Sequence, residues 1–261
     1  MAGVLKSDLE GGVQTITLAR PAARNALNLE LIQALVAALA EAAESAAARC
    51  VVLTGEGKAF CAGGDVNDML ERAGKAVATK ERLQGGLNRI AQLVWHMEKP
   101  VVAKVNGDAT GAGMDLVLVC DLAYAADHAR FGASFVRVGL IPDTGGTHTL
   151  PRRVGMHRAK ELVFLGDLIP ATQAEALGII NRAVPAADLD AHVGAVVARL
   201  ASGPTKTIGL AKRALHKGAA ASFEEALEHE AYAQGFCFTT EDHREAARAF
   251  VEKRDARFKG A

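Results

Sequence analysis

The chain has 261 residues, half of them hydrophobic, and its 30 basic and 30 acidic side chains leave no net charge. This length and composition suffice for one domain with a large core, or for one domain with a helical extension. The balanced charge, with no block of like charges, argues against a surface that binds nucleic acid or a membrane.

The first residues, Met1 to Lys6, lack a basic segment followed by a long apolar one, so we expect no signal peptide. No apolar run reaches the roughly 18 to 20 residues that a membrane-spanning helix needs.

The four cysteines, at positions 50, 61, 120 and 237, show no C-x-x-C spacing. We therefore expect reduced, structural thiols in a cytoplasmic protein. No histidine spacing is typical of a metal site.

The first third of the chain alternates between strand and helix patterns. Residues 4–18 are expected to form a hairpin that turns at Gly11-Gly12. Asn28 is a typical helix N-cap, and apolar residues then recur on one helical face through Leu39. A short buried strand is predicted at 50–54.

The next stretch begins with a polar segment, from about 67 to 85, that is expected to be mobile. Leu87 to Val94 has a helical pattern and leads to a strand at 100–105. Two further strands are predicted at 122–126 and 129–131, which gives the chain a β-β-α rhythm.

Residues 101–121 carry the most informative pattern in the chain. A β-branched strand ends at Asn106-Gly107, and the turn Gly111-Ala112-Gly113 then opens an apolar helix. A helix that begins at such a turn offers unpaired N–H groups, which can bind a phosphate or a developing oxyanion. The absence of side chains at 111 and 113 would let a ligand approach the main chain. Asp115 lies in the first turn of this helix.

A nicotinamide cofactor is one alternative for this turn, because Gly107, Gly111 and Gly113 have the spacing of a dinucleotide-binding loop. Such a loop belongs after the first strand of its domain, whereas this one lies about 105 residues into the chain. The Tyr-x-x-x-Lys pair of short-chain dehydrogenases is also missing. A dehydrogenase remains the alternative to be tested by nicotinamide binding.

A second glycine turn, Ala62-Gly63-Gly64-Asp65, follows the predicted strand at 50–54, and two such turns can grip one carbonyl oxygen from both sides. With both turns in place, the chain resembles the crotonase family, also called the enoyl-CoA hydratase/isomerase family. Seven segments match in the family's order: Arg20–Asn28, Ala59–Asp65, Val105–Gly113, Cys120-Asp121, Phe131-Gly132, Gly139–Thr147 and Phe250–Arg254.

The resemblance implies an α/β superhelix of repeated β-β-α turns, with a core over 1–200 and a helical trimerisation region over 201–261. It implies a coenzyme A thioester as substrate, with no permanently bound cofactor and no metal. The thioester oxygen would lie between the backbone N–H groups of Gly64 and Ala112. Residues implied to bind coenzyme A are Arg24, Ala26, Ala62, Asp65, Val66, Phe258 and Lys259, the last two across a subunit interface.

The carboxylates depart from the hydratases that the chain resembles. Asp115 stands where those enzymes have their first glutamate, and Phe135 stands where they have the second. Asp143 is the second candidate catalytic residue, although an Asp between Pro142 and two glycines is also common in turns and helix caps. The stretch around Asp143 looks most like ring-epoxide isomerases, and the Asp115 and Asp143 combination looks like dienoyl-CoA isomerases. Isomerisation is therefore favoured, and hydration is the alternative.

The last part of the chain is predicted to be helical, with capping boxes at Thr172-x-x-Glu175 and Ser222-x-x-Glu225. The best boundary is Ala201-Ser-Gly-Pro204. The family resemblance places the tail between subunits of a trimer or a dimer of trimers, whereas the alternative is a helix pair over its own core.

RNA binding, which occurs in some family members, is disfavoured by the zero net charge and the few aromatic residues. Asp121 is interpreted as structural.

Overall fold

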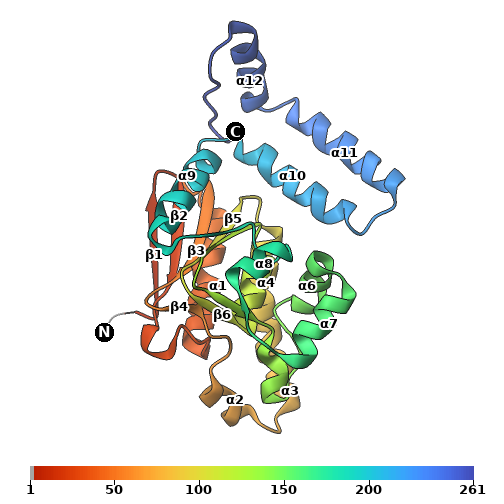
Figure 1. Ribbon diagram of the computed structural model, residues 1–261. Coiled ribbons are helices and arrows are strands. Elements are labelled where there is room, and N and C mark those ends of the chain that lie inside the picture. Colours follow the sequence, from red (N-terminus) through yellow and green to blue (C-terminus); the bar gives the residue numbers. More distant parts are fainter. Residues whose placement is uncertain (1–2) are drawn as a thin grey trace.

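The computed structural model describes residues 3–261. Its larger sheet has the strand order β1-β2-β3-β5-β7-β10, and its smaller sheet has the order β4-β6-β8-β9 (Figure 1). The larger sheet consists of β1 (Leu5–Glu10), β2 (Val13–Leu18), β3 (Cys50–Gly55), β5 (Val101–Val105), β7 (Leu122–Ala126) and β10 (Arg182–Val184). The smaller sheet consists of β4 (Ala59–Cys61), β6 (Asp108–Thr110), β8 (Arg130–Gly132) and β9 (Ile169–Pro170).

Helices connect and cover the strands. The α-helices are α1 (Leu29–Glu44), α2 (Val66–Arg72), α3 (Ala76–Gly85), α4 (Leu87–His96), α5 (Ala112–Val119), α6 (Gly146–Val154), α7 (Met156–Leu165), α8 (Ala171–Ala176), α9 (Leu189–Ala201), α10 (Thr205–Gly218), α11 (Phe223–Cys237) and α12 (Glu241–Glu252). Three short 3₁₀ helices are η1 (Pro21–Ala23), η2 (Ser134–Val138) and η3 (Ala186–Asp188).

Along the chain, strands are added alternately to the larger and the smaller sheet. β3, β5 and β7 lie parallel in the larger sheet, and each is followed by a strand of the smaller sheet and then by helices. β4, β6 and β8 are also parallel to one another. Each turn of the chain thus contributes one strand to each sheet, which confirms the predicted superhelix of β-β-α turns. The hairpin of β1 and β2 is also confirmed.

The core lies where these turns stack. All six residues of β3 are buried, because both faces of the strand are covered: Val51 and Leu53 pack in the main core, and Cys50 and Val52 pack against α9. All eight residues of α5 are buried as well, so this helix runs through the interior rather than along the surface. A helix that is apolar all round is stable only in such surroundings. The first turn of α5, with Asp115, is therefore held rigidly.

Two local predictions were borne out and one is wrong, while the mobility expected of the segment 67–85 stays a prediction. The Asn28 side chain caps α1 by accepting from the Leu31 N–H at 3.0 Å, and the capping box at Ser222 is present. The box expected at Thr172 is wrong, because α8 begins at Ala171 directly after Pro170 and uses no side-chain cap. The segment 67–85 forms two helices, α2 and α3, which bury none of their residues and so leave no apolar period in the sequence.

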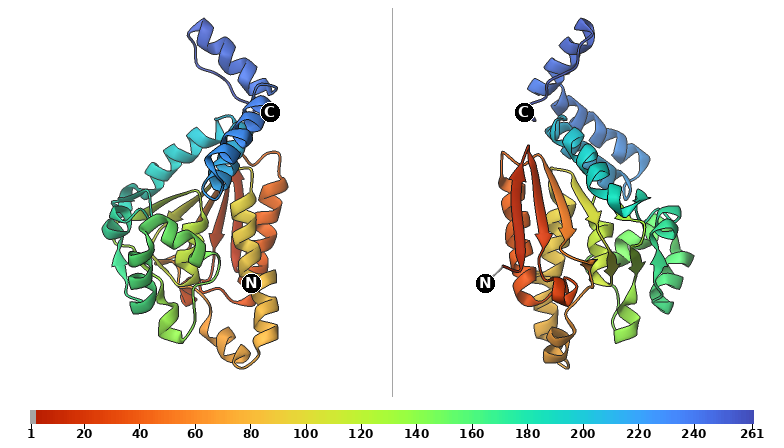
Figure 2. Two further views of the ribbon diagram at one scale, coloured as in Figure 1. Left: turned by 90° about the vertical axis from the view of Figure 1, so that its right-hand side faces the viewer. Right: turned by 60° about the vertical axis from the view of Figure 1, so that its left-hand side comes forward.

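The C-terminal helices leave the core after α9 ends at Ala201. α10 is fastened to the core by the buried Lys212 ammonium, which donates to the Val94 carbonyl at 2.7 Å and to Asp121 Oδ2 at 2.8 Å. Asp121 also accepts from the Val101 N–H at 2.7 Å, so its structural role is confirmed. α11 pairs with α10, and α12 projects beyond them (Figures 1 and 2).

The four cysteines are buried and unpaired. Over residues 3–261, no three His, Cys, Asp or Glu side chains come together in a way that could hold a metal ion. In the same part of the chain, no helix combines the length and apolarity needed to cross a bilayer.

Candidate active site

The segment Arg20–Asn28 and the glycine turn Ala62–Asp65 lie side by side. The Ala62 N–H donates to the Arg24 carbonyl at 3.0 Å, and the Leu27 N–H donates to the Gly63 carbonyl at 2.8 Å. The Asp65 N–H in turn donates to the Leu27 carbonyl at 3.2 Å. This short parallel ladder fixes the backbone of Gly64 while leaving its own N–H out of the pairing.

The two glycine turns touch each other, as predicted. A Cβ on Gly63 would lie 2.7 Å from the Thr110 carbonyl oxygen and 3.4 Å from the Ala112 nitrogen, so only glycine allows this approach. The Thr110 hydroxyl ties the turns together by donating to the Ala62 carbonyl at 3.0 Å. Between residues 3 and 261, neither the Gly64 nor the Ala112 N–H has a backbone acceptor. Both amides are thus free of backbone partners at the positive end of α5, and their predicted role as donors to one thioester oxygen stays a prediction.

Gly113 has a different role from the one predicted. A Cβ at this position would lie 2.2 Å from the Cys61 carbonyl oxygen. The missing side chain therefore allows α5 to pack directly against β4, and it does not open the main chain to a ligand. Gly111, in contrast, has a φ of +53° at the N-cap of α5, a conformation that disfavours other residues.

A cavity of about 630 Å³ lies beside the two turns. Gly64 and Ala112 form part of its wall, together with Phe135 and Asp143. Most of the remaining wall comes from α2, α3 and the start of α4, and only α4 among these was predicted as a helix from the sequence. The cavity thus places two free backbone donors, one carboxyl group and apolar side chains around the same space, which is the usual composition of a ligand site.

Asp143 is a turn residue as well as a cavity residue. Its backbone carbonyl accepts from the Gly146 N–H at 2.7 Å, while the N-cap of α6 is Gly145 rather than Asp143. The Asp143 carboxylate accepts from the Thr144 hydroxyl at 2.7 Å. Burial raises the pKa of Asp143, and the Thr144 hydrogen bond and the positive charge of Arg72 partly offset that rise. A carboxyl group with a raised pKa is suited to taking up and returning a proton near neutral pH.

Asp115 lies behind this wall, in the first turn of α5. It is 1% exposed, and neither carboxyl oxygen has a hydrogen-bond partner among the described residues. Burial raises the pKa of Asp115 well above its usual range, and the nearby charge of Asp143 raises it further. Both effects disfavour the ionised form of Asp115. A Cβ on Gly146 would lie 2.3 Å from Asp115 Oδ2, so the start of α6 closes over the carboxyl group.

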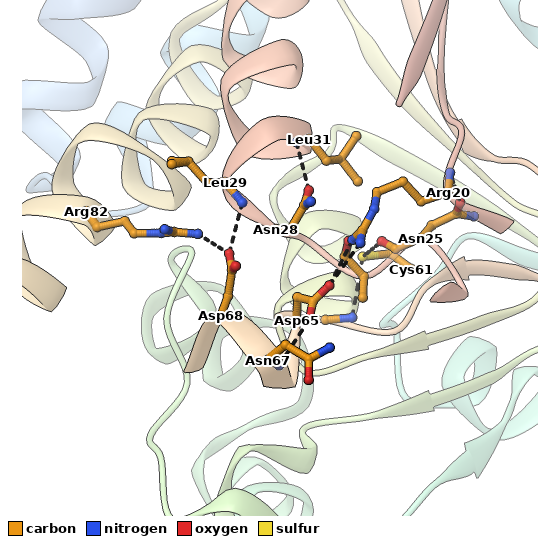
Figure 3. Close-up of polar contacts among 12 residues, drawn as sticks. Arg20, Asn25, Asn28, Leu29, Leu31, Cys61, Asp65, Asn67, Asp68 and Arg82 are labelled. Atoms are coloured by element: carbon orange, nitrogen blue, oxygen red, sulfur yellow. Dashed lines mark hydrogen bonds and ion pairs between the residues drawn. The ribbon is translucent and has the colours of Figure 1, made fainter. Parts of the chain in front are cut away.

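The predicted coenzyme A residues near the glycine turn are held by an ion pair that the sequence did not reveal. Arg20 Nη1 lies 3.0 Å from Asp65 Oδ2, and the other Asp65 oxygen caps α2 by accepting from the Asn67 N–H at 3.1 Å (Figure 3). The Asp65 side chain is thus engaged within the protein, whereas Val66 is 56% exposed beside it. Arg24 and Ala62 belong to the backbone ladder, and Ala26 lies in the adjoining turn, where its N–H donates to the Ala23 carbonyl at 3.0 Å. Their contact with coenzyme A stays a prediction.

The two C-terminal candidates lie far from this site in a single chain. The Lys259 N–H donates to Asp242 Oδ1 at 2.7 Å, and the Phe258 carbonyl accepts from Arg49 Nη1 at 3.2 Å. The C-terminus and the α2–α3 segment lie at opposite ends of the molecule (Figure 1). Phe258 and Lys259 could therefore reach a coenzyme A molecule only in a neighbouring subunit, and this role also stays a prediction.

Comparison with known proteins agrees with this geometry. Residues 8–261 match the family model described as enoyl-CoA hydratase/isomerase. The chain is 36% identical over 261 residues, and over the full length of both chains, to the 1,2-epoxyphenylacetyl-CoA isomerase of Escherichia coli. It is 36% identical to the short-chain-enoyl-CoA hydratase of Clostridium acetobutylicum, over 94% of this chain and 93% of that one.

A solved structure gives the same result for the fold. The enoyl-CoA hydratase of Bacillus anthracis superposes with a TM-score of 0.92 at 34% identity, over 99% of this chain and 100% of that one. The paired glycine turns, the superhelix and these relatives agree over nearly the whole length of the chain. The chain belongs to the enoyl-CoA hydratase/isomerase family, known as the crotonases.

Proposed function

We propose that this crotonase isomerises an enoyl-CoA, by moving a double bond or rearranging a ring, through a thioester enolate. The observation that carries the proposal is the composition of the cavity wall, where Asp143 is the single carboxyl group and Phe135 packs nearby as a buried ring. Hydration needs a water molecule that is held and activated while a second group handles the α-carbon proton. An apolar ring at position 135 disfavours such a water.

In the proposed reaction, the thioester oxygen accepts hydrogen bonds from the Gly64 and Ala112 N–H groups. The Asp143 carboxylate removes a proton from C2 of a 3-enoyl-CoA, and the electron pair of that C–H bond becomes the enolate. The protonated Asp143 then returns the proton to C4, so that the double bond moves from C3–C4 to C2–C3. Asp115 would assist by limiting the negative charge near Asp143, because burial disfavours its ionised form.

Hydration is the second candidate, and one observation favours it. The charge of Asp143 raises the pKa of Asp115, which means that the two carboxyl groups are close enough to interact. They could act as a dyad that adds water to a 2-enoyl-CoA, and the Clostridium and Bacillus relatives carry hydratase names.

Two assays separate these reactions. We expect the enzyme to convert a 3-enoyl-CoA into the conjugated 2-enoyl-CoA, followed by its absorbance, and to incorporate little ¹⁸O from labelled water into 2-enoyl-CoA. Rapid ¹⁸O incorporation without double-bond migration would instead establish a hydratase.

We further infer that residues 201–261 assemble the chain into a trimer or a dimer of trimers. Large apolar side chains lie exposed on α11 and beyond, where a single chain offers nothing to cover them: Phe223, Tyr232, Phe236 and Phe250 are each more than half exposed. Light scattering is expected to give a multiple of three times the 27.3 kDa chain mass. A monomer that persists at all concentrations would contradict this inference.

A further inference from the structure

The wall of the active-site cavity carries an excess of positive charge. Three basic residues, Arg72, Lys75 and Arg82, line the cavity together with the single carboxyl group of Asp143. They come from α2, the following turn and α3, so they lie on one side of the space. A cavity built only for a hydrocarbon chain has no need of these charges.

The three cations are not equally engaged. Arg82 forms an ion pair with Asp68, but its Nε is buried and has no hydrogen-bond partner in the described chain (Figure 3). Arg72 donates from Nε to the Asp68 backbone carbonyl at 2.9 Å. Neither Arg72 nor Lys75 has a carboxylate within ion-pair distance among residues 3–261, so both keep charge-assisted donors for a ligand.

The position of these cations points to the acyl part of the substrate rather than to the nucleotide part. The residues proposed to contact coenzyme A, including Arg24, Ala62 and Val66, lie outside the lining of this cavity. The same cavity contains the two oxyanion donors and Asp143, which must meet the thioester and the carbons next to it. Arg72 lines the same cavity as Asp143, and its positive charge lowers the pKa of that carboxyl group, so the arginine faces the space that the acyl group would occupy.

We propose that the acyl group of the substrate ends in a carboxylate, which Arg72 binds with help from Lys75. This inference rests on the proposed coenzyme A thioester site. A guanidinium group can bind a carboxylate through two parallel hydrogen bonds, and the flexible Lys75 adds a point charge at the rim. Because Arg72 and Asp143 line one cavity of about 630 Å³, the substrate class is a short dicarboxylic acid joined to coenzyme A through one of its ends.

Binding of unreactive substrate analogues tests the proposal without depending on the reaction type. Saturated CoA thioesters of five to eight carbons would be compared by calorimetry, each in a methyl-terminated and a carboxylate-terminated form. Hydrogen bonds to charged groups contribute enough for roughly a 10-fold preference or more. We expect the wild-type enzyme to bind the carboxylate-terminated form more tightly by that factor at one or more chain lengths.

The variant Arg72→Gln is expected to abolish most of that preference, and Arg72→Lys to retain part of it. Lys80→Gln is the matched control, because Lys80 is an exposed cation of α3 that does not line the cavity. It should leave the preference unchanged. Circular dichroism, together with binding of the methyl-terminated thioester, shows that each variant is folded.

The possible outcomes distinguish a failure of the proposed function from a failure of the carboxylate inference. If neither form of thioester binds the wild-type enzyme, the proposed function fails. If both forms bind equally well at every length, the thioester site stands and the carboxylate inference is overturned. If Arg72→Gln weakens both forms by the same factor, the arginine serves the coenzyme A phosphates or the fold, and the inference is likewise overturned.

Discussion

Replacing Asp143 by asparagine is expected to slow double-bond migration by roughly 10²- to 10⁴-fold, the range for removing a general acid–base group. Asparagine has nearly the same shape, and its side-chain oxygen can still accept from Thr144, so the turn before α6 should persist. The measurement is the rate of conversion of a 3-enoyl-CoA. Asp127→Asn is the matched control, since that side chain is 56% exposed beyond the end of β7.

The pH dependence of the same rate gives an independent readout. Asp143 must be ionised to take the first proton, and burial raises its pKa. The rate is therefore expected to rise with pH through that raised pKa, and this limb should vanish in the Asp143→Asn variant. Unchanged activity in a folded Asp143→Asn enzyme would mean that Asp143 is only a turn residue and that Asp115 carries the chemistry.

Replacing Gly64 by proline removes one of the two donors to the thioester oxygen, because proline has no N–H. Loss of one oxyanion-hole donor typically lowers turnover by roughly 10²- to 10³-fold, and we expect a decrease of that size. Turnover would be measured at saturating substrate, with thermal unfolding as a check on the fold.

Gly64→Ala is the matched control, since it keeps the amide. Its Cβ would lie 2.4 Å from Met69 Cε, the end of a flexible side chain that can move away. Alanine should therefore cost much less activity than proline. Wild-type turnover in a folded Gly64→Pro enzyme would exclude the assignment of this amide to the oxyanion hole.

Local patterns predicted the parts of the site that are built from backbone. The β-branched residues of β5 and the glycines around Ala112 correctly predicted a strand and a buried helix. The three-residue strand β6 between them was missed, because so short a segment shows no period. Contact between the turns at Gly63 and Ala112 depends on packing between strands far apart in sequence, and the family resemblance supplied it.

The site residues that could not be predicted from the sequence were missed for one physical reason. α2 and α3 bury no side chain, so neither shows an apolar stripe, and their position depends on long-range contacts such as that of Asp68 with the Leu29 N–H at 2.9 Å. Arg20 and Asp65 are 45 positions apart, and no spacing rule joins them. Arg72 was missed for the same reason, because a single arginine on a helix without a period gives no sign of the cavity it faces.

The closure of α6 over Asp115 links two positions that are 31 residues apart. The carboxyl group occupies the space that a side chain at position 146 would need, with all three of its atoms within 2.4 Å of a Cβ built there. Giving Gly146 a methyl group would therefore drive the Asp115 carboxyl group out of its present place. The buried acid at position 115 depends on the absence of a side chain at position 146. A substitution in the first turn of α6 can thus move an acid that belongs to a different helix.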